Sequence, residues 1–168
     1  MKVEDIKLYF AYNEWANKRI LNAAKHATAE QLTAPNDIGW GDLRGALTHI
    51  LDAEYGWFAF LFGREDEGII DPASFADIAA LRARWERQND IARGCLDTLA
   101  DEDLNRNHSR QRDGRQYDWV LWQALVHVVN HGTQHRAECA AILTGFGHSP
   151  GDMDFTLFLR EREESAIT

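Results

Sequence analysis

The sequence contains few of the residues that interrupt helices or cross-link a chain. Only three prolines occur in 168 residues, so long stretches lack the residue that breaks a helix interior. Two cysteines are too few for a disulfide framework in a chain of this length. Because Cys95 and Cys139 both fall among the apolar positions of helical patterns, we expect them to be buried, reduced thiols.

Long apolar runs and an excess of positive charge are also missing. The longest purely apolar run, WFAFLF at 57–62, is far shorter than the roughly 20 residues that span a bilayer. Charges are scattered through residues 1–20, unlike the apolar core of a signal peptide, so we expect a cytoplasmic protein with no membrane partner. Acidic residues outnumber basic ones by 27 to 18. This argues against nucleic acid as a partner, since a phosphate backbone is bound by clustered Lys and Arg.

What the chain does have is helical periodicity throughout a length that suits one domain, residues 1–168. Apolar residues recur at three- and four-residue steps in four stretches, namely about 3–26, 43–62, from Ser74 to about Leu99, and about Asp118 to Gly145. The sequence SFAD at 74–77 favours Ser74 as a helix cap. Gly63 and Gly145 are typical helix ends.

Two shorter elements complete the expected fold. Asp113-Gly114 predicts the turn of a short hairpin between the third and fourth helices, and a short final helix is expected over 152–163. The prediction is therefore an all-α fold. It is a bundle of four antiparallel helices, with a hairpin excursion between helices three and four and a short C-terminal helix.

Three of the seven histidines, His127, His131 and His135, stand at four-residue intervals in the fourth helix. Residues four apart lie on one face of a helix. His131 and His135 fall inside the apolar stripe of that helix, whereas His127 falls on its edge. Two imidazoles in a bundle core are costly unless something satisfies them, and one metal ion would satisfy both.

A third ligand should come from another helix, and His49 is the best candidate. It flanks the apolar stripe of the second helix, among small residues that leave room for an ion. The remaining histidines, which are expected at the surface, are His26, His108 and His148. Three imidazoles leave coordination positions open, as catalytic sites do. Zn²⁺ is the leading choice, with Ni²⁺, Fe²⁺ or Mn²⁺ as alternatives. The Glu-x-x-His units of di-iron bundles do not occur on these helices.

Four segments together resemble the DinB-like, damage-inducible proteins of bacteria, which share a fold with thiol-dependent transferases and isomerases. The segments are YNEWANKRIL at 12–21, HILDAEYGWFAFLFG at 49–63, HVVNHGTQHRAE at 127–138 and GHSPGDMDFTLFLRE at 147–161. The family pattern has one metal histidine on helix two and a His-x-x-x-His pair, followed by Arg, on helix four. The resemblance thus implies His49, His131 and His135 as ligands, with Arg136 in the following position. It does not make His127 a ligand.

The resemblance also implies a function, a metal-dependent thiol S-transferase of detoxification or stress response. Its partners would be a low-molecular-weight thiol and an electrophile such as an epoxide, quinone or halide. A metal-coordinated thiol is deprotonated by the charge of the ion, and the thiolate is the nucleophile. Arg136 and Lys18 are candidates for binding the carboxylates of the thiol.

Two other functions stay open. The first is a metal-dependent hydrolase that activates water, for which Asp52, Glu54 and Glu138 are the local candidate acids or bases. The second is a metal-binding or sensory bundle without turnover. Six tryptophans and eight phenylalanines exceed what one modest bundle easily buries. Together with the habit of the family, this predicts a homodimer.

Overall fold

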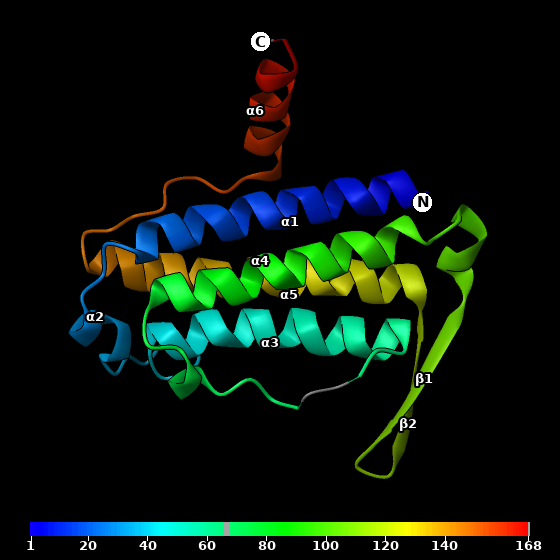
Figure 1. The fold of residues 1–168 in the computed structure, drawn as a ribbon, viewed down its shortest axis with the longest axis horizontal. Coiled ribbons are helices and arrows are strands. Elements are labelled where there is room, and N and C mark those ends of the chain that lie inside the picture. The colour runs from blue at the N-terminus through cyan, green and yellow to red at the C-terminus, as the bar shows by residue number, and fades with distance from the viewer. Residues whose placement is uncertain (66–67, 168) are drawn as a thin grey trace.

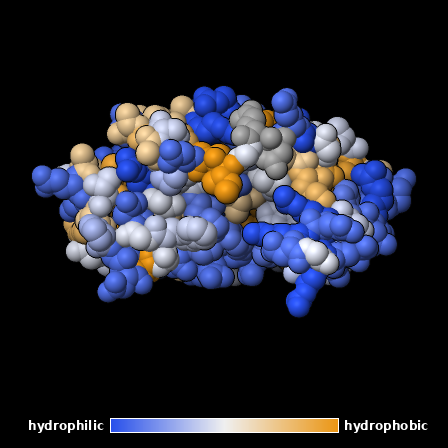
Figure 2. Space-filling model, turned by 90° about the horizontal axis from the view of Figure 1, so that it is seen from below, coloured by the Kyte–Doolittle hydropathy of each residue, from blue (hydrophilic) through white to orange (hydrophobic). Residues whose placement is uncertain are grey.

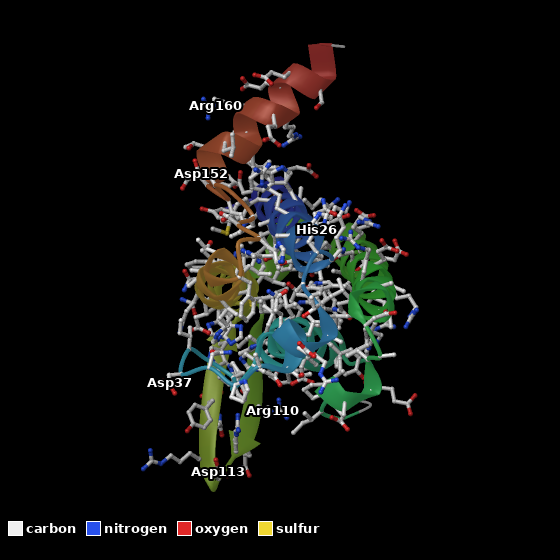
Figure 3. All side chains as sticks on the ribbon, turned by 90° about the vertical axis from the view of Figure 1, so that its left-hand side faces the viewer. His26, Asp37, Arg110, Asp113, Asp152 and Arg160 are labelled. Carbon is white, nitrogen blue, oxygen red and sulfur yellow. The ribbon has the colours of Figure 1, made fainter. Side chains whose placement is uncertain are left out.

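The computed structural model describes residues 1–65 and 68–167, and four long helices form a bundle at its centre (Figure 1). The helices are α1 (Val3–Ala24), α3 (Leu43–Phe62), α4 (Ile78–Asp97) and α5 (Leu121–Gly145). Helix α1 packs against α4 and α5, and α3 packs against the same two helices. Figure 3 looks along the bundle and shows the four helices end-on. The expected all-α bundle is confirmed.

The expected antiparallel arrangement is only half right. Early in α1, Lys7 pairs with Asp97 at the end of α4, and late in α1, Asn22 accepts a hydrogen bond from Arg82 near the start of α4. Likewise His49 and Trp57 of α3 contact His135 and His127 of α5, so these two pairs of neighbours are antiparallel. Figure 1 shows that α3 and α4 instead run in the same direction, so that α3 ends and α4 begins at opposite ends of the bundle. Periodicity predicts where a helix is apolar, but it does not predict the direction in which the helix runs.

Shorter elements connect and extend the bundle. They are α2 (Ala29–Thr33), the 3₁₀ helices η1 (Pro72–Ser74) and η2 (Asp101–Asn105), the strands β1 (Asn107–Arg112) and β2 (Arg115–Val120), and α6 (Phe155–Ile167). The two strands pair as an antiparallel hairpin. Asp113 and Gly114 have φ of 52° and 73°, as the predicted turn requires. The hairpin and α6 both project from the bundle (Figures 1 and 3).

Three predicted boundaries of the bundle helices differ from the structure, and the final helix spans Phe155–Ile167 instead of the expected 152–163. Helix α1 ends at Ala24, because Thr28 caps a separate short helix, α2, by accepting a hydrogen bond from the Gln31 N–H. Ser74 ends η1 and does not cap α4, whose cap is Asp77, three residues later. Asp118 belongs to β2, so α5 begins at Leu121. In the last two cases the periodic pattern extended the predicted helix over residues that belong to η1 or to β2.

The apolar core has two main clusters at different levels of the bundle. One contains Leu47, Leu81 and Leu143, and the other contains Phe58 and Leu96 among other residues. Both predicted buried thiols are confirmed as free and buried, Cys139 in the first cluster and Cys95 in the second.

A polar layer lies inside the bundle and joins all four long helices. Glu54 Oε1 of α3 accepts hydrogen bonds from Asn13 Nδ2 and Asn17 Nδ2 of α1 at 2.7 and 2.9 Å. Arg136 Nη1 of α5 donates to the oxygens of the same two asparagines. From α4, Trp85 Nε1 donates to Glu54 Oε2 at 3.2 Å. A buried glutamate and a buried arginine are thus connected through two asparagines.

Close approach of α1 and α5 makes this layer possible. Gly132 faces the network, and a Cβ there would lie 2.7 Å from Arg136 Nη1 and 3.0 Å from Asn13 Oδ1. Any larger residue would therefore displace the groups that make these hydrogen bonds.

The outer surface is largely polar on the side that Figure 2 shows. Its hydrophobic residues lie in small separate groups between hydrophilic ones. Within the part of the chain that the structure describes, no helix combines the length and the hydropathy needed to cross a bilayer.

Replacing Arg136 with Met should lower the free energy of unfolding by about 3–5 kcal/mol, since it leaves the buried Glu54 without its opposite charge. Urea denaturation measures this loss. Arg93→Met is the matched control, because it removes an arginine from an exposed pair with Glu14 and should cost less than about 1 kcal/mol. Equal losses in the two variants would contradict the role assigned to the polar layer.

Candidate metal centre

The structure brings together the three histidines that the sequence singled out as metal ligands. His49 lies on α3, and His131 and His135 lie one turn apart on the facing side of α5. One ring nitrogen from each of the three lies within 4.8 Å of the others. The arrangement could hold a metal ion, while the binding itself stays a prediction.

The three imidazole rings of the cluster lie close together. The centroids of His49 and His131 are 4.9 Å apart, those of His49 and His135 4.7 Å, and those of His131 and His135 4.4 Å. His49 Nε2 and His131 Nε2 are 3.2 Å apart. A hydrogen bond at this distance requires a proton on one of the two nitrogens, and both must be without that proton to bind one ion.

Glu138 orients the third histidine. Its Oε2 lies 2.7 Å from His135 Nδ1, one turn along the same helix. A proton on Nδ1 donates to this carboxylate and leaves the Nε2 lone pair free, which is the arrangement that fixes the tautomer of metal-binding histidines in proteins. The chemistry of this donor set therefore fits a divalent ion that imidazoles bind, although it does not select one metal.

The cluster is partly removed from water, and this favours the neutral form of two of its imidazoles, His49 and His131. His135 is 9% exposed, while His49 and His131 are half-buried. Burial, reinforced by repulsion from His135 and His49, lowers the pKa of His131 to about 4. Burial, followed by repulsion from His135, also lowers the pKa of His49. Neutral imidazoles are the form that binds a metal.

The loop between α2 and α3 covers part of the cluster. The Trp40 ring stacks on the His49 ring with centroids 3.8 Å apart, although Trp40 remains 55% exposed. Asp42 caps α3 by accepting a hydrogen bond from Gly45 N–H at 2.6 Å, which fixes the start of the helix just after Trp40. Asp37, on the same loop, lies on the side of the bundle where α3 and α5 meet (Figure 3).

His127 stands outside the ligand group, as expected from its place at the edge of the stripe. Its side chain is exposed. Its ring centroid lies 5.7 Å from that of His131 and 5.1 Å from that of Trp57. The other three histidines are also outside the cluster. The ring centroids of His26 and His148 lie 6.2 Å apart. His108 lies in β1 beside Phe60.

The structure does not place either proposed thiol-binding cation at the cluster. Arg136 is 1% exposed and belongs to the polar layer, and Lys18 pairs with Glu14 on α1 at 2.7 Å. Helical geometry explains the first case, because consecutive residues on a helix point about 100° apart. If His135 faces α3, then Arg136 faces α1.

Two of the candidate carboxylates are also used elsewhere. Glu54 accepts its hydrogen bonds in the bundle core, and Asp52 accepts one from the Ile70 backbone N–H at 2.8 Å. Glu138 does lie at the cluster, bonded to His135.

Sequence reasoning named Glu138 only as a candidate acid or base and did not name Trp40. The contact between Glu138 and His135 was detectable, because residues three apart on a helix are neighbours. Trp40 was not detectable, because it lies in a loop, where periodicity gives no direction for a side chain.

Comparisons with known proteins support the family resemblance seen in the sequence. A model of the DinB family matches residues 1–166. The chain is also similar to Protein DinB of Bacillus subtilis (strain 168), with 26% identity over 167 residues that cover 95% of this chain and 96% of that protein.

Replacing His49, His131 or His135 with Ala should sharply reduce the metal content of protein reconstituted with Zn²⁺, because each substitution removes one of three ligand nitrogens. His127→Ala is the control and should retain most of the metal. Elemental analysis of the four purified variants measures the outcome. A site that empties with His127→Ala but stays filled with His135→Ala would refute the assignment.

Gly39→Ala should weaken metal binding roughly 10- to 100-fold, the usual effect of disturbing a group that orients a ligand. An added Cβ would lie 2.6 Å from Glu138 Oε2, the atom that contacts His135. Gly41→Ala is a matched control, because Gly41 also has positive φ but nothing lies within 4 Å of its added Cβ. Competition with a chromophoric chelator measures the affinity, and similar losses in both variants would point to backbone strain instead.

Metal-free protein should lose stability as the pH falls from about 6.5, the pKa of a free histidine, toward 4. The unfolded chain takes up a proton on His131 in this range, whereas the folded chain, with its pKa of about 4, does not. Protonation therefore favours the unfolded state. Urea denaturation at several pH values tests this, and His131→Gln should show a shallower dependence. Parallel profiles for the two proteins would exclude His131 as a cause.

Proposed function

The chain belongs to the DinB family, and from this premise we propose that His49, His131 and His135 bind one divalent metal ion that activates a low-molecular-weight thiol. The observation that carries the proposal is the meeting of three histidine nitrogens within 4.8 Å, one ring being held by a carboxylate. Zn²⁺ is the favoured ion for three imidazoles, and Ni²⁺, Fe²⁺ and Mn²⁺ are the alternatives.

The chemistry that the ion supplies when bound is a lowered pKa of a coordinated thiol, which makes the thiolate available at neutral pH. Burial lowers the pKa of His49 and of His131, so these two imidazoles can bind an ion with little loss of protons. Glu138 fixes the orientation of His135. Because His49 and His131 are only half-buried, a small molecule can reach the cluster from solvent.

The reaction that we propose is a transfer of the thiol to an electrophile such as an epoxide, quinone or halide. The thiol proton goes to solvent, and the sulfur forms a bond to carbon. The electron pair of the bond that breaks goes to the departing halide, to the epoxide oxygen or, through the conjugated double bond, to the quinone oxygen, and these oxygens take up a proton from solvent. The Trp40 ring, which stacks on His49, offers apolar surface to the carbon skeleton of such a substrate.

One observation favours thiol transfer over hydrolysis. Activation of water in a hydrolase calls for a general base near the reacting oxygen. Of the three carboxylates considered, Glu54 and Asp52 accept hydrogen bonds elsewhere, and Glu138 is bonded to His135. A thiol needs less help from such a base, because its own pKa is already much lower than that of water.

A metal-binding bundle without turnover is the second candidate. It would need neither a base nor a thiol pocket, and the family assignment leaves it open. The predicted homodimer and cytoplasmic location belong to either function and stay predictions.

Protein loaded with Zn²⁺ should accelerate the reaction of a thiol with 1-chloro-2,4-dinitrobenzene or an epoxide above the spontaneous rate. Cysteine, glutathione and coenzyme A serve as thiol probes. The excess rate should disappear after chelation and in His135→Ala, while His127→Ala should keep it, since it retains the ligands.

Other outcomes would decide between the alternatives. Ester or amide cleavage that needs metal but no thiol would support the hydrolase. Fully metal-loaded protein that accelerates none of these reactions would support the bundle without turnover.

A further inference from the structure

A cavity of about 210 Å³ lies between α1 and α4, on the opposite side of the bundle from the seam of α3 and α5 that holds the histidines. None of the three histidines lines it. An engineered cavity of about 150 Å³ in another protein holds benzene. The space between α1 and α4 therefore suffices for a six-membered ring with one small substituent.

The walls of this cavity are apolar. Phe10 and Ala11 of α1 face Ala92 and Leu96 of α4 across it. Leu96 is 2% exposed, and the Phe10 ring packs edge-on against Phe58 in the core at 5.3 Å. Such walls favour the carbon skeleton of a ligand over water.

The floor is polar and has unused capacity to accept hydrogen bonds. It contains Asn13 and Glu54, which are 2% and 5% exposed. Glu54 Oε1 accepts two hydrogen bonds, while Oε2 accepts one among the described residues, from Trp85 Nε1. Each carboxylate oxygen has two lone pairs, so Oε2 can accept another donor.

Gln88 provides a second polar group at this level of α4. It lies one turn after Trp85, which contacts Glu54, and one turn before Ala92, which lines the cavity. Its side chain is fully buried, and neither its nitrogen nor its oxygen has a hydrogen-bond partner within the described part of the chain. Buried amides are normally satisfied, but Gln88 does not itself line the cavity, so it marks a polar position beside the site and provides no contact to a ligand.

Charges around the cavity are already paired. At the rim, Lys7 pairs with Asp97 at 2.9 Å, and Arg93 pairs with Glu14. At the floor, Glu54 is connected through asparagines to Arg136. A charged ligand would meet no uncompensated opposite charge, whereas a neutral one avoids the cost of desolvating an ion.

We propose that the α1–α4 cavity is a binding site for a small neutral organic molecule with an apolar ring or chain and one hydrogen-bond-donating head, which Glu54 accepts. The site is separate from the histidine cluster, and the proposal does not depend on the function assigned to that cluster.

Titration of the zinc-loaded full chain with phenol tests the proposal, because phenol has a ring that fits and one O–H donor. The readout is the indole N–H resonance of Trp85 in a proton–nitrogen correlation spectrum, assigned with Trp85→Phe. Phenol should shift this resonance saturably, since the indole shares Glu54 with the ligand. Anisole, which has no donor, should bind roughly three- to tenfold more weakly, the contribution of one hydrogen bond.

Two leucine variants locate the binding. Ala92→Leu fills the cavity and should weaken phenol binding about tenfold or more, as expected for a small ligand excluded by added bulk. Ala83→Leu, an exposed position on the same helix outside the cavity, should leave binding unchanged. If Ala92→Leu does not fold, Ala11→Leu adds the same bulk from α1.

Some results would overturn the proposal. Undiminished phenol binding in the folded cavity-filling variant, or shifts confined to residues near the histidines, would place the ligand elsewhere. No saturable shift at all would remove the site. Benzylammonium that binds as tightly as phenol would overturn the assignment of a neutral ligand.

Discussion

The contact on which the rest of the molecule depends is the buried pair of Glu54 and Arg136, joined through Asn13 and Asn17. A carboxylate and a guanidinium inside a bundle are costly unless nearly every donor and acceptor finds a partner. Apolar side chains can slide past one another at small cost, but this set of hydrogen bonds is satisfied in only one alignment of the helices. The layer therefore sets the height of each helix relative to the others, in addition to any stability that it contributes.

The polar layer also sets the relative height of α3 and α5, and thereby brings the histidines of the cluster together. Arg136 directly follows His135, and Glu54 lies little more than one turn after His49 on α3. When the polar layer holds these two helices at one height, His49 and His135 meet on the adjacent seam. Arg136 thus affects the cluster only by fixing the position of α5. It does not contact the space where a ligand would bind.

The sequence predicted the parts of the molecule that local periodicity determines. The four helical stripes, the hairpin turn at Asp113-Gly114 and the separation of His127 from the other histidines all follow from the repeat of 3.6 residues or from backbone preferences. The parallel course of α3 and α4 did not follow, because a stripe looks the same for either direction of the chain. The contact of Trp40 with His49 depends on the path of a loop, and the asparagine partners of Arg136 lie on α1, so neither has a local signature.

The stacking of Trp40 on His49 gives the protein an optical property. An ion bound by the His49 imidazole would lie close to the indole of Trp40, because the two rings are in contact. Paramagnetic ions such as Ni²⁺ or Co²⁺ quench the emission of nearby fluorophores. Metal binding at the cluster would then change the intrinsic tryptophan fluorescence, so occupancy could be measured without a label. Trp40 is more than half exposed while Trp85 is buried in the core, so their emission would differ in wavelength. A change at Trp40 would appear on the long-wavelength side of the combined emission of six tryptophans.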